Sequence, residues 1–254
     1  MSFNAPGPSA SPSSRPQPHP QPHPYTQPQP PQFIDVLRSP QGLATALTAL
    51  LCVCAALALA ASGIGLYAWK LRGDLVADPR DSVRESLEVA DSSLVPIGAW
   101  QLLTGLATAV VFLVWFYRVR CNGQVFRPDG FSQSTGWAVG GWFVPLANLF
   151  FPYRTAREIW DASTQHAPDG SYRPTSGALV IAWWLTFVGG RTLDFLSSRK
   201  SLAAETAEAV RDADLFAAMA DLTTFGAAVL AVLFVRKLTA MQRVKAARGP
   251  IAAV

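Results

Sequence analysis

Charged side chains are scarce in this chain, and they are unevenly placed. Aspartate, glutamate, lysine and arginine make up 15% of its 254 residues, against about 25% in a typical soluble domain. No charged residue lies between Arg38 and Lys70, and three later stretches are nearly as apolar. This scarcity excludes an ordinary water-soluble domain. The net charge of +4 has its excess beside the apolar stretches, which is not the pattern of a nucleic-acid-binding protein.

Cysteine and catalytic motifs are also lacking. Cys52 and Cys54 lie two apart in the first apolar run and point to different faces of a helix, and Cys121 follows the second run. These three exclude a disulfide framework and are interpreted as small apolar fillers. No H-E-x-x-H, G-x-S-x-G or phosphate-cradling glycine loop is present, and His166 stands alone in a polar stretch. The sequence therefore predicts no enzyme, no cofactor and no metal site.

The chain has instead four long apolar runs, each bounded by charge. They cover residues 42–69, 94–117, 174–190 and 215–235, and the third is the shortest. A helix needs about 20 apolar residues to cross a hydrocarbon core, so each run predicts a membrane-spanning helix. We therefore expect an all-α integral membrane protein, in which residues 36–243 form a four-span helical bundle.

Basic residues set the expected orientation. Residues 236–248 and the middle segment 118–173 are rich in lysine or arginine, whereas the connections 70–93 and 191–214 carry most of the acids. Because cytoplasmic segments are enriched in basic residues, we expect both termini in the cytoplasm, with a basic tail over 244–254. Abundant alanine, and arginine in excess over lysine, are typical of a GC-rich bacterial genome. The expected location is the bacterial cytoplasmic membrane.

Residues 1–35 form a proline-rich tail. Its repeat, PQPHPQPHPYTQPQPP, places proline at nearly every second position and offers few apolar side chains. We expect it to be disordered, with local polyproline II structure. Two interpretations stay open. Residues 1–32 are either a docking arm for a cytosolic protein that reads proline, with Pro28 and Pro31 in one P-x-x-P, or a solubilising spacer.

The segment 131–153 is uncharged and long enough to span. A fifth span would place the termini on opposite sides of the membrane and would translocate Arg118, Arg120 and Arg127. Glycines, Pro145 and several polar residues also interrupt any helix here. We therefore expect a re-entrant or interfacial segment that does not cross, followed by an amphipathic surface helix over 153–164.

The densest motif runs over residues 141–160, G-W-F-V-P-L-A-N-L-F-F-P-Y-R-T-A-R-E-I-W. Pro145 stops a helix, Asn148 suits a turn and Pro152 can open a new helix. In that helix two pairs of opposite charge stand four residues apart: Arg154 with Glu158, and Arg157 with Asp161.

This W-F-x-P-x-x-N-L-x-x-P-x-x-x-x-R-E-x-W pattern resembles the hallmark of a bacterial membrane family known as domain of unknown function 4328. The resemblance covers roughly residues 42–243, including V-R-K-L-T-x-M-Q at 235–242. It implies a fold and a topology, and it implies no activity. The motif positions are candidate contacts for a lipid head group or a partner, and the alternative is that they only cap and pair the turn. They are Trp142, Pro145, Asn148, Pro152, Arg157, Glu158 and Trp160.

Asp221 is the one acid inside an apolar run. Acids within a membrane are functional candidates, but Asp221 lies near the outer end of its run, where it can reach water or meet Arg191. Two functions follow. We favour a non-enzymatic, membrane-anchored interaction or scaffold protein that contacts membrane lipid. The alternative is a small oligomeric transporter or channel that uses Asp221. A homo-oligomer stays open, and no nucleic-acid partner is expected.

Overall fold

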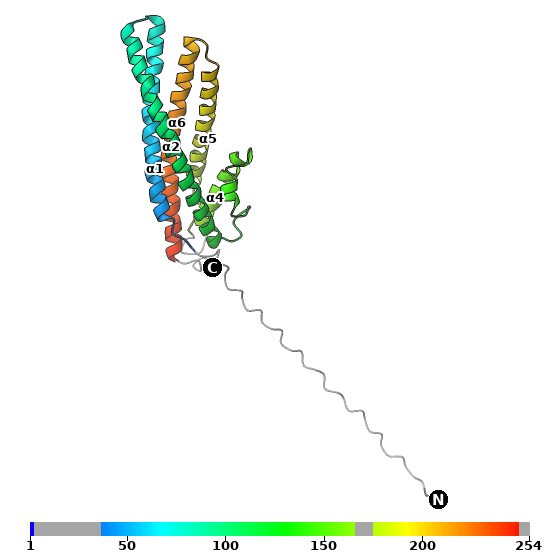
Figure 1. Ribbon diagram of the computed structural model, residues 1–254. Helices are drawn as coiled ribbons and strands as arrows, with labels where there is room; N and C mark the ends of the chain where they lie inside the picture. The colour runs from blue at the N-terminus through cyan, green and yellow to red at the C-terminus, as the bar shows by residue number, and fades with distance from the viewer. Residues whose placement is uncertain (3–36, 166–174, 249–254) are drawn as a thin grey trace. The chain divides into compact units, whose positions relative to one another are not determined.

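The computed structural model describes residues 1–2, 37–165 and 175–248, and every secondary-structure element in these ranges is helical (Figure 1). The proline-rich tail, His166 and residues 249–254 of the basic tail lie outside the described residues, apart from the first two residues of the chain.

Four long helices correspond to the four predicted apolar runs, and the third of them begins at Ala178, inside the predicted run 174–190. They are α1 (Gln41–Ala77), α2 (Asp81–Phe126), α5 (Ala178–Leu202) and α6 (Ala207–Arg248). Each is long and apolar enough to cross a membrane, which indicates a membrane protein and confirms the predicted helical class. The helices continue past the apolar runs into the charged segments, so only residues 78–80 connect α1 to α2 and residues 203–206 connect α5 to α6.

The four helices pack in a fixed order. α1 lies along both α2 and α6, and α6 lies along both α1 and α5. Small residues allow α1 and α6 to approach closely: a Cβ added at Gly65 would lie 3.3 Å from the Cβ of Ala218. The hydroxyl of Ser62 donates a hydrogen bond of 2.9 Å to the carbonyl of Ala218. Such contacts are typical of helices that associate in lipid, where close packing replaces the hydrophobic effect.

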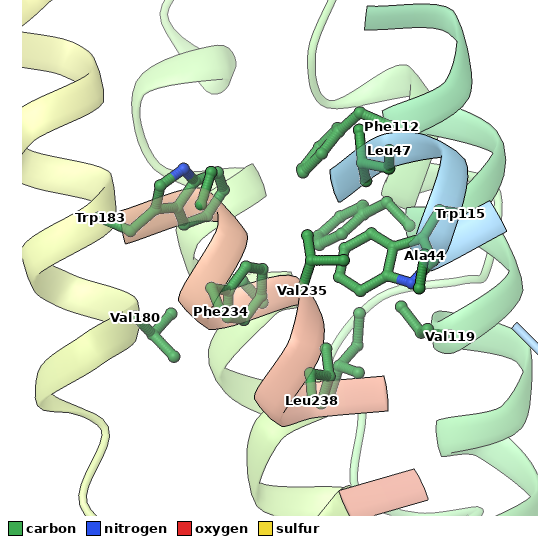
Figure 2. Close-up of a cluster of buried hydrophobic side chains, with 14 of the residues drawn as sticks. Ala44, Leu47, Phe112, Trp115, Val119, Val180, Trp183, Phe234, Val235 and Leu238 are labelled. Atoms are coloured by element: carbon green, nitrogen blue, oxygen red, sulfur yellow. The ribbon is translucent and has the colours of Figure 1, made fainter. Parts of the chain in front are cut away.

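The main core lies at the end of the bundle where α1 begins and α2 and α6 end, and it is aromatic (Figure 2). Trp115 and Phe234 are fully buried and meet edge to face, with ring centroids 5.8 Å apart. Phe234 also stacks on Trp183 of α5 at 4.9 Å. The Trp115 indole donates to the hydroxyl of Thr239, 3.2 Å away. Large rings with defined edge and face contacts fix the relative rotation of α2, α5 and α6.

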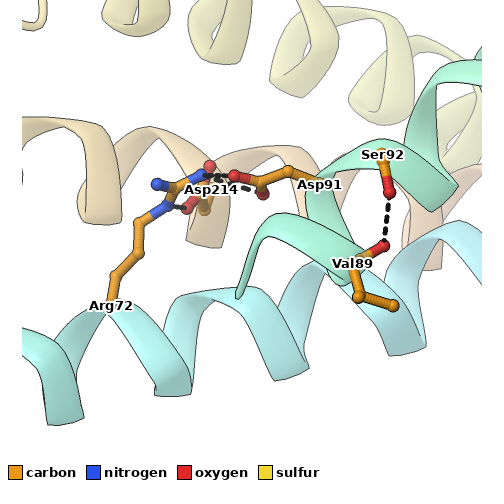
Figure 3. A network of polar contacts seen from close by, with 5 residues as sticks. All are labelled: Arg72, Val89, Asp91, Ser92 and Asp214. Atoms are coloured by element: carbon orange, nitrogen blue, oxygen red, sulfur yellow. Dashed lines mark hydrogen bonds and ion pairs between the residues drawn. The ribbon is translucent and has the colours of Figure 1, made fainter. Parts of the chain in front are cut away.

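At the opposite end a charged cluster joins three helices (Figure 3). The Arg72 guanidinium of α1 donates to both carboxylate oxygens of Asp91 on α2, at 2.8 and 2.9 Å, and also to Asp214 on α6. The Nη2 atom of Arg72 donates to both Asp91 oxygens and its Nε donates to Asp214, so one planar guanidinium binds two carboxylates. Arg72 therefore ties α1, α2 and α6 together beyond their apolar runs.

Between α2 and α5 the chain forms a short, irregular segment. It contains α3 (Trp137–Gly140), the 3₁₀ helix η2 (Ala147–Leu149) and α4 (Phe151–Ser163). α4 begins two residues before the predicted helix 153–164, and Pro152 occupies its first turn, where the missing N–H costs nothing. No long helix forms over 131–150, as the glycines and Pro145 predict.

Candidate functional site

Residues 141–150, here called the elbow, connect α3 to α4 through turns. The elbow closes with hydrogen bonds from the Ala147 N–H to the Pro145 carbonyl at 2.8 Å and from the Asn148 N–H to the Val144 carbonyl at 3.0 Å. Leu146 has a φ of 64°, the only positive φ of a non-glycine residue in the described part of the chain. Glycine is the residue that adopts such a positive φ without cost. At Leu146 the angle therefore stores backbone strain. The unusual angle therefore falls at Leu146, and Asn148 lies in the short 3₁₀ helix that follows it.

The elbow exposes most of its apolar side chains. Leu146 is 78% exposed, Phe143 69% and Phe150 68%. Val144 and Leu149 are exposed beside them. Five exposed apolar side chains within one short segment indicate a contact with a membrane, a ligand or another protein.

Trp142 points the other way and anchors the elbow. Its ring meets Phe112 and Phe116 of α2 edge to face, at centroid distances of 5.3 and 6.2 Å. It also meets Trp184 and Phe187 of α5, at 5.9 and 6.0 Å. Trp142 thus fills the space between α2 and α5, and the strained elbow rests on a rigid aromatic base.

α4 holds the other side of the elbow. Its Ala156, Ile159 and Trp160 are fully buried. Trp160 stacks on Phe234 at 6.1 Å, and the Lys237 ammonium lies 5.4 Å from the centre of its ring. Trp160 is therefore a packing residue that joins α4 to α6.

The charged face of α4 carries the two predicted pairs. Arg154 lies 3.3 Å from Glu158, and Arg157 lies 3.6 Å from Asp161, which confirms the predicted spacing. Glu158 also accepts hydrogen bonds from the backbone and the hydroxyl of Ser132. These contacts assign Glu158 to the attachment of the preceding loop.

Arg157 has a second contact that the sequence did not reveal. Its guanidinium occupies the space in which a Cβ at residue 177 would lie, which only a glycine leaves open. Arg157 therefore packs across Gly177, directly before α5, and joins α4 to the beginning of α5.

Arg120 fixes the loop that leads into the elbow. Its guanidinium is buried and lies 3.5 Å from the centre of the Phe131 ring. It donates to the Gln133 carbonyl and to the Gln124 side chain, each at 2.8 Å. A guanidinium stacked on a ring and hydrogen-bonded in its plane is well compensated for its burial.

A buried polar network connects α4 to the ends of α1, α2 and α6. Gln242 donates to the Val119 carbonyl at 2.9 Å and to the Ser163 hydroxyl at 3.2 Å, and it accepts from the Asn122 amide at 3.1 Å. Asn122 in turn pairs with the backbone N–H and C=O of Arg38, at 3.0 and 2.9 Å. All polar groups of the Asn122 and Gln242 side chains have partners, so the network holds the joined segments in one specific arrangement.

Lys245 completes the attachment of α4. Its ammonium donates to the Ala162 and Thr164 carbonyls, each at 2.9 Å, at the end where the helix has unpaired carbonyls. The sequence motif 235–242 contained Gln242, but a glutamine at one position of a helix gives no signal of its three partners.

Asp221 does not meet Arg191. Its carboxylate accepts a 2.8 Å hydrogen bond from the Gln101 side chain of α2, whereas Arg191 pairs with Asp194 at 2.6 Å. Asp221 thus links α6 to α2. No cluster of three or more His, Cys, Asp or Glu side chains that could hold a metal ion occurs among the described residues.

Pro145 and Asn148 lie on the exposed part of the elbow, whereas Pro152 is buried at the start of α4. Of the predicted contact residues, the structure thus brings Trp142, Pro152, Arg157, Glu158 and Trp160 into the support of the elbow. The apolar surface itself combines two motif positions, Phe143 and Leu149, with three residues that the motif leaves unspecified, Val144, Leu146 and Phe150.

Four apolar helices and a supported elbow between the second and third of them define a multi-pass membrane protein of the helical class. Residues 78–240 match the family model described as a domain of unknown function (DUF4328), and the chain belongs to this family. The match begins just after α1, covers α2 to α5 together with the elbow, and ends within α6. Neither the curated proteins nor the solved structures contain a match to the chain.

Proposed function

We propose that the protein is a non-enzymatic, membrane-anchored interaction protein whose elbow contacts the acyl chains of the inner leaflet. The observation that carries this proposal is the exposed apolar surface of residues 143–150 on a rigid base. A mobile loop would turn such side chains inward, whereas Trp142 and α4 hold these outward.

The depth of the elbow supports lipid as its contact. Trp142 touches Phe112, six positions before Arg118 on α2, and Phe187, nine positions after the start of α5 at Ala178. At 1.5 Å per residue these contacts lie about 9 Å inside the charged end of the apolar run of α2 and about 14 Å inside the start of α5. The following residues of the elbow are then level with the apolar runs, and a re-entrant segment is the arrangement that fits them.

The distribution of basic and acidic residues supports an orientation of the bundle with the elbow at the cytoplasmic side of the membrane. Arg118, Arg236, Lys237 and Arg243 surround the end of the bundle that holds the elbow, and the acid-rich connections lie at the other end. By the enrichment of basic residues in cytoplasmic segments, the elbow and both termini face the cytoplasm of a bacterial cell. The α4 helix then lies at the inner surface, with its charged face toward water.

Spin labelling of the elbow tests lipid contact. In a variant without Cys52, Cys54 and Cys121, a nitroxide is attached at Leu146→Cys, with Ser134→Cys on the exposed loop before α3 as control. In proteoliposomes we expect the label at 146 to collide readily with oxygen and weakly with a water-soluble nickel complex. The label at 134 should show the reverse. Equal nickel accessibility at the two positions would contradict acyl-chain contact.

The interaction role has a separate test. The proline-rich residues 1–32 are proposed as a docking arm, and they lie outside the described residues. Deleting them should remove co-purifying cytosolic proteins while the thermal unfolding of the membrane part stays unchanged. Unchanged co-purification would leave the spacer interpretation.

A transporter or channel that uses Asp221 is the second candidate, because an acid at membrane depth is rare. The hydrogen bond from Gln101 instead favours a helix-pairing role. Asp221→Asn keeps an oxygen that can accept this bond, so a pairing role predicts normal folding and no change in ion flux into liposomes. Loss of a flux present in the parent protein would favour the transporter.

A further inference from the structure

The apolar thickness of the bundle is uneven. α1 carries no charged residue over 41–69, and α2 carries none over 92–117. At 1.5 Å per residue these stretches are each about 40 Å long. This exceeds the hydrocarbon core of about 30 Å, and helix tilt or projection can absorb the excess.

The uncharged stretches of α5 and α6 are much shorter than those of α1 and α2. α5 is uncharged only over 178–190, and α6 only over 222–235, between Asp221 and Arg236. Each stretch is about 20 Å long. The lower limit on α5 is fixed, because the Arg157 guanidinium packs on Gly177 just before the helix. This side of the bundle is thus about 10 Å thinner than the hydrocarbon core.

Polar side chains from three helices gather where the short stretches end. We call them the polar step: Gln101, Arg191, Asp194, Asp221 and Thr224. Arg191 pairs with Asp194 at 2.6 Å and lies 3.5 Å from the Thr224 hydroxyl, and Gln101 donates to Asp221. The Arg191 and Asp194 side chains remain 58% and 41% exposed. Only one helical turn separates Arg191 from Phe187, which touches Trp142.

Acyl chains do not solvate the charged side chains of the polar step. An arginine can extend its long side chain toward the surface, but an aspartate cannot reach far. Three charged residues, Arg191, Asp194 and Asp221, would each have to be left in hydrocarbon, whereas one local thinning of the bilayer, whose cost per Å is modest, relieves all three. Deformation of the bilayer is the cheaper solution.

We propose that phospholipid headgroups and water descend onto the polar step and thin the leaflet opposite the elbow by about 10 Å, on the α5 side alone. Arg191 offers a donor to the phosphate, and Asp194 and Asp221 offer acceptors to a headgroup ammonium. On the side of α1 and α2 the leaflet keeps its full thickness.

Two matched labels test the asymmetry. In the cysteine-free variant, nitroxides are placed at Thr192→Cys on α5 and at Leu106→Cys on α2, both at exposed positions. Counted from Phe187 and from Phe112, which both touch Trp142, Leu106 lies farther toward the same surface than Thr192. In proteoliposomes of phosphatidylethanolamine and phosphatidylglycerol, we expect nickel accessibility at 192 to exceed that at 106 at least fivefold.

A second variant tests whether the polar step causes the thinning. Replacing Arg191 and Asp194 with leucine extends the apolar stretch of α5, so the nickel accessibility at 192 should fall toward that at 106. Equal accessibility of 192 and 106 in the parent protein would overturn the proposal. So would a label at 192 that is unaffected by the two leucines. Neither outcome bears on the label at 146.

Discussion

Replacing Gln242 with alanine should lower the free energy of unfolding by about 2–4 kcal/mol. The side chain is 1% exposed and makes three hydrogen bonds, to groups on α2 and α4. Its loss leaves one Asn122 N–H buried without a partner, at a cost of about 1–3 kcal/mol. The Val119 carbonyl keeps its helical bond, and the Ser163 hydroxyl keeps its bond to the Ile159 carbonyl, so these two contribute little. The missing methylene and the cavity add about 1 kcal/mol.

The measurement is an equilibrium titration from mild detergent into sodium dodecyl sulfate, followed by far-ultraviolet circular dichroism. Gln242→Leu separates the two contributions, because it keeps the volume and removes the hydrogen bonds. It should cost about 1–3 kcal/mol. Arg243→Ala is the matched control, since Arg243 is the exposed neighbour on the same helix and should change stability by less than about 0.5 kcal/mol.

One outcome would contradict the role of Gln242. If Gln242→Ala and Arg243→Ala unfold at the same detergent composition, the buried network contributes nothing to the attachment of α4. The base under the elbow would then be held by the aromatic contacts alone.

Three further outcomes follow from the same geometry and are measured in the same titration. Arg72→Ala should cost about 1–2 kcal/mol, because it leaves the partly exposed Asp91 and Asp214 carboxylates facing each other. Arg80→Ala removes an exposed ion pair and is the control. An equal loss of stability in the two variants would contradict the role of Arg72 in tying α1, α2 and α6 together. Gly177→Ala should destabilise the protein by about 1–2 kcal/mol, because the added methyl displaces Arg157. Gly42→Ala is the control: its methyl enters open space, so the change should be neutral or slightly stabilising. Equal effects of the two substitutions would argue against the packing of Arg157 on Gly177. Trp115→Phe should cost about 1 kcal/mol more than Trp160→Phe. The reason is that the Trp115 indole N–H donates to Thr239, whereas the buried Trp160 N–H has no partner in the described structure. The reverse order would show that the Trp160 N–H is satisfied.

The long-range order of the chain was readable from its sequence, because apolar runs bounded by charge have one solution in a membrane. The four helices and the break over 131–150 followed from this rule and from the glycines and prolines. The pairs of Arg154 with Glu158 and of Arg157 with Asp161 followed from helical spacing. These features depend on residues close together in the chain.

The parts that were not predicted depend on distant residues. Gln242 meets Val119 and Ser163 only after α2, α4 and α6 have packed, and no local pattern encodes that meeting. Trp142, a candidate lipid or partner contact, fills the space between α2 and α5, and no local pattern identifies the four rings that surround it. The partner of Asp221 proved to be Gln101, since the rotation of α2 about its axis, which a sequence does not specify, decides which polar side chain faces α6.

The attachment of α4 to α6 has a consequence for biosynthesis. Phe234, Gln242 and Lys245, which hold α4 in place, belong to α6, which leaves the ribosome after the elbow, α4 and α5. Until α6 is made, α4 lacks these contacts, so the support of the elbow is complete only once α6 has been translated. A nascent chain stalled before residue 234 would therefore reach the bilayer with its first three long helices but without a fixed elbow.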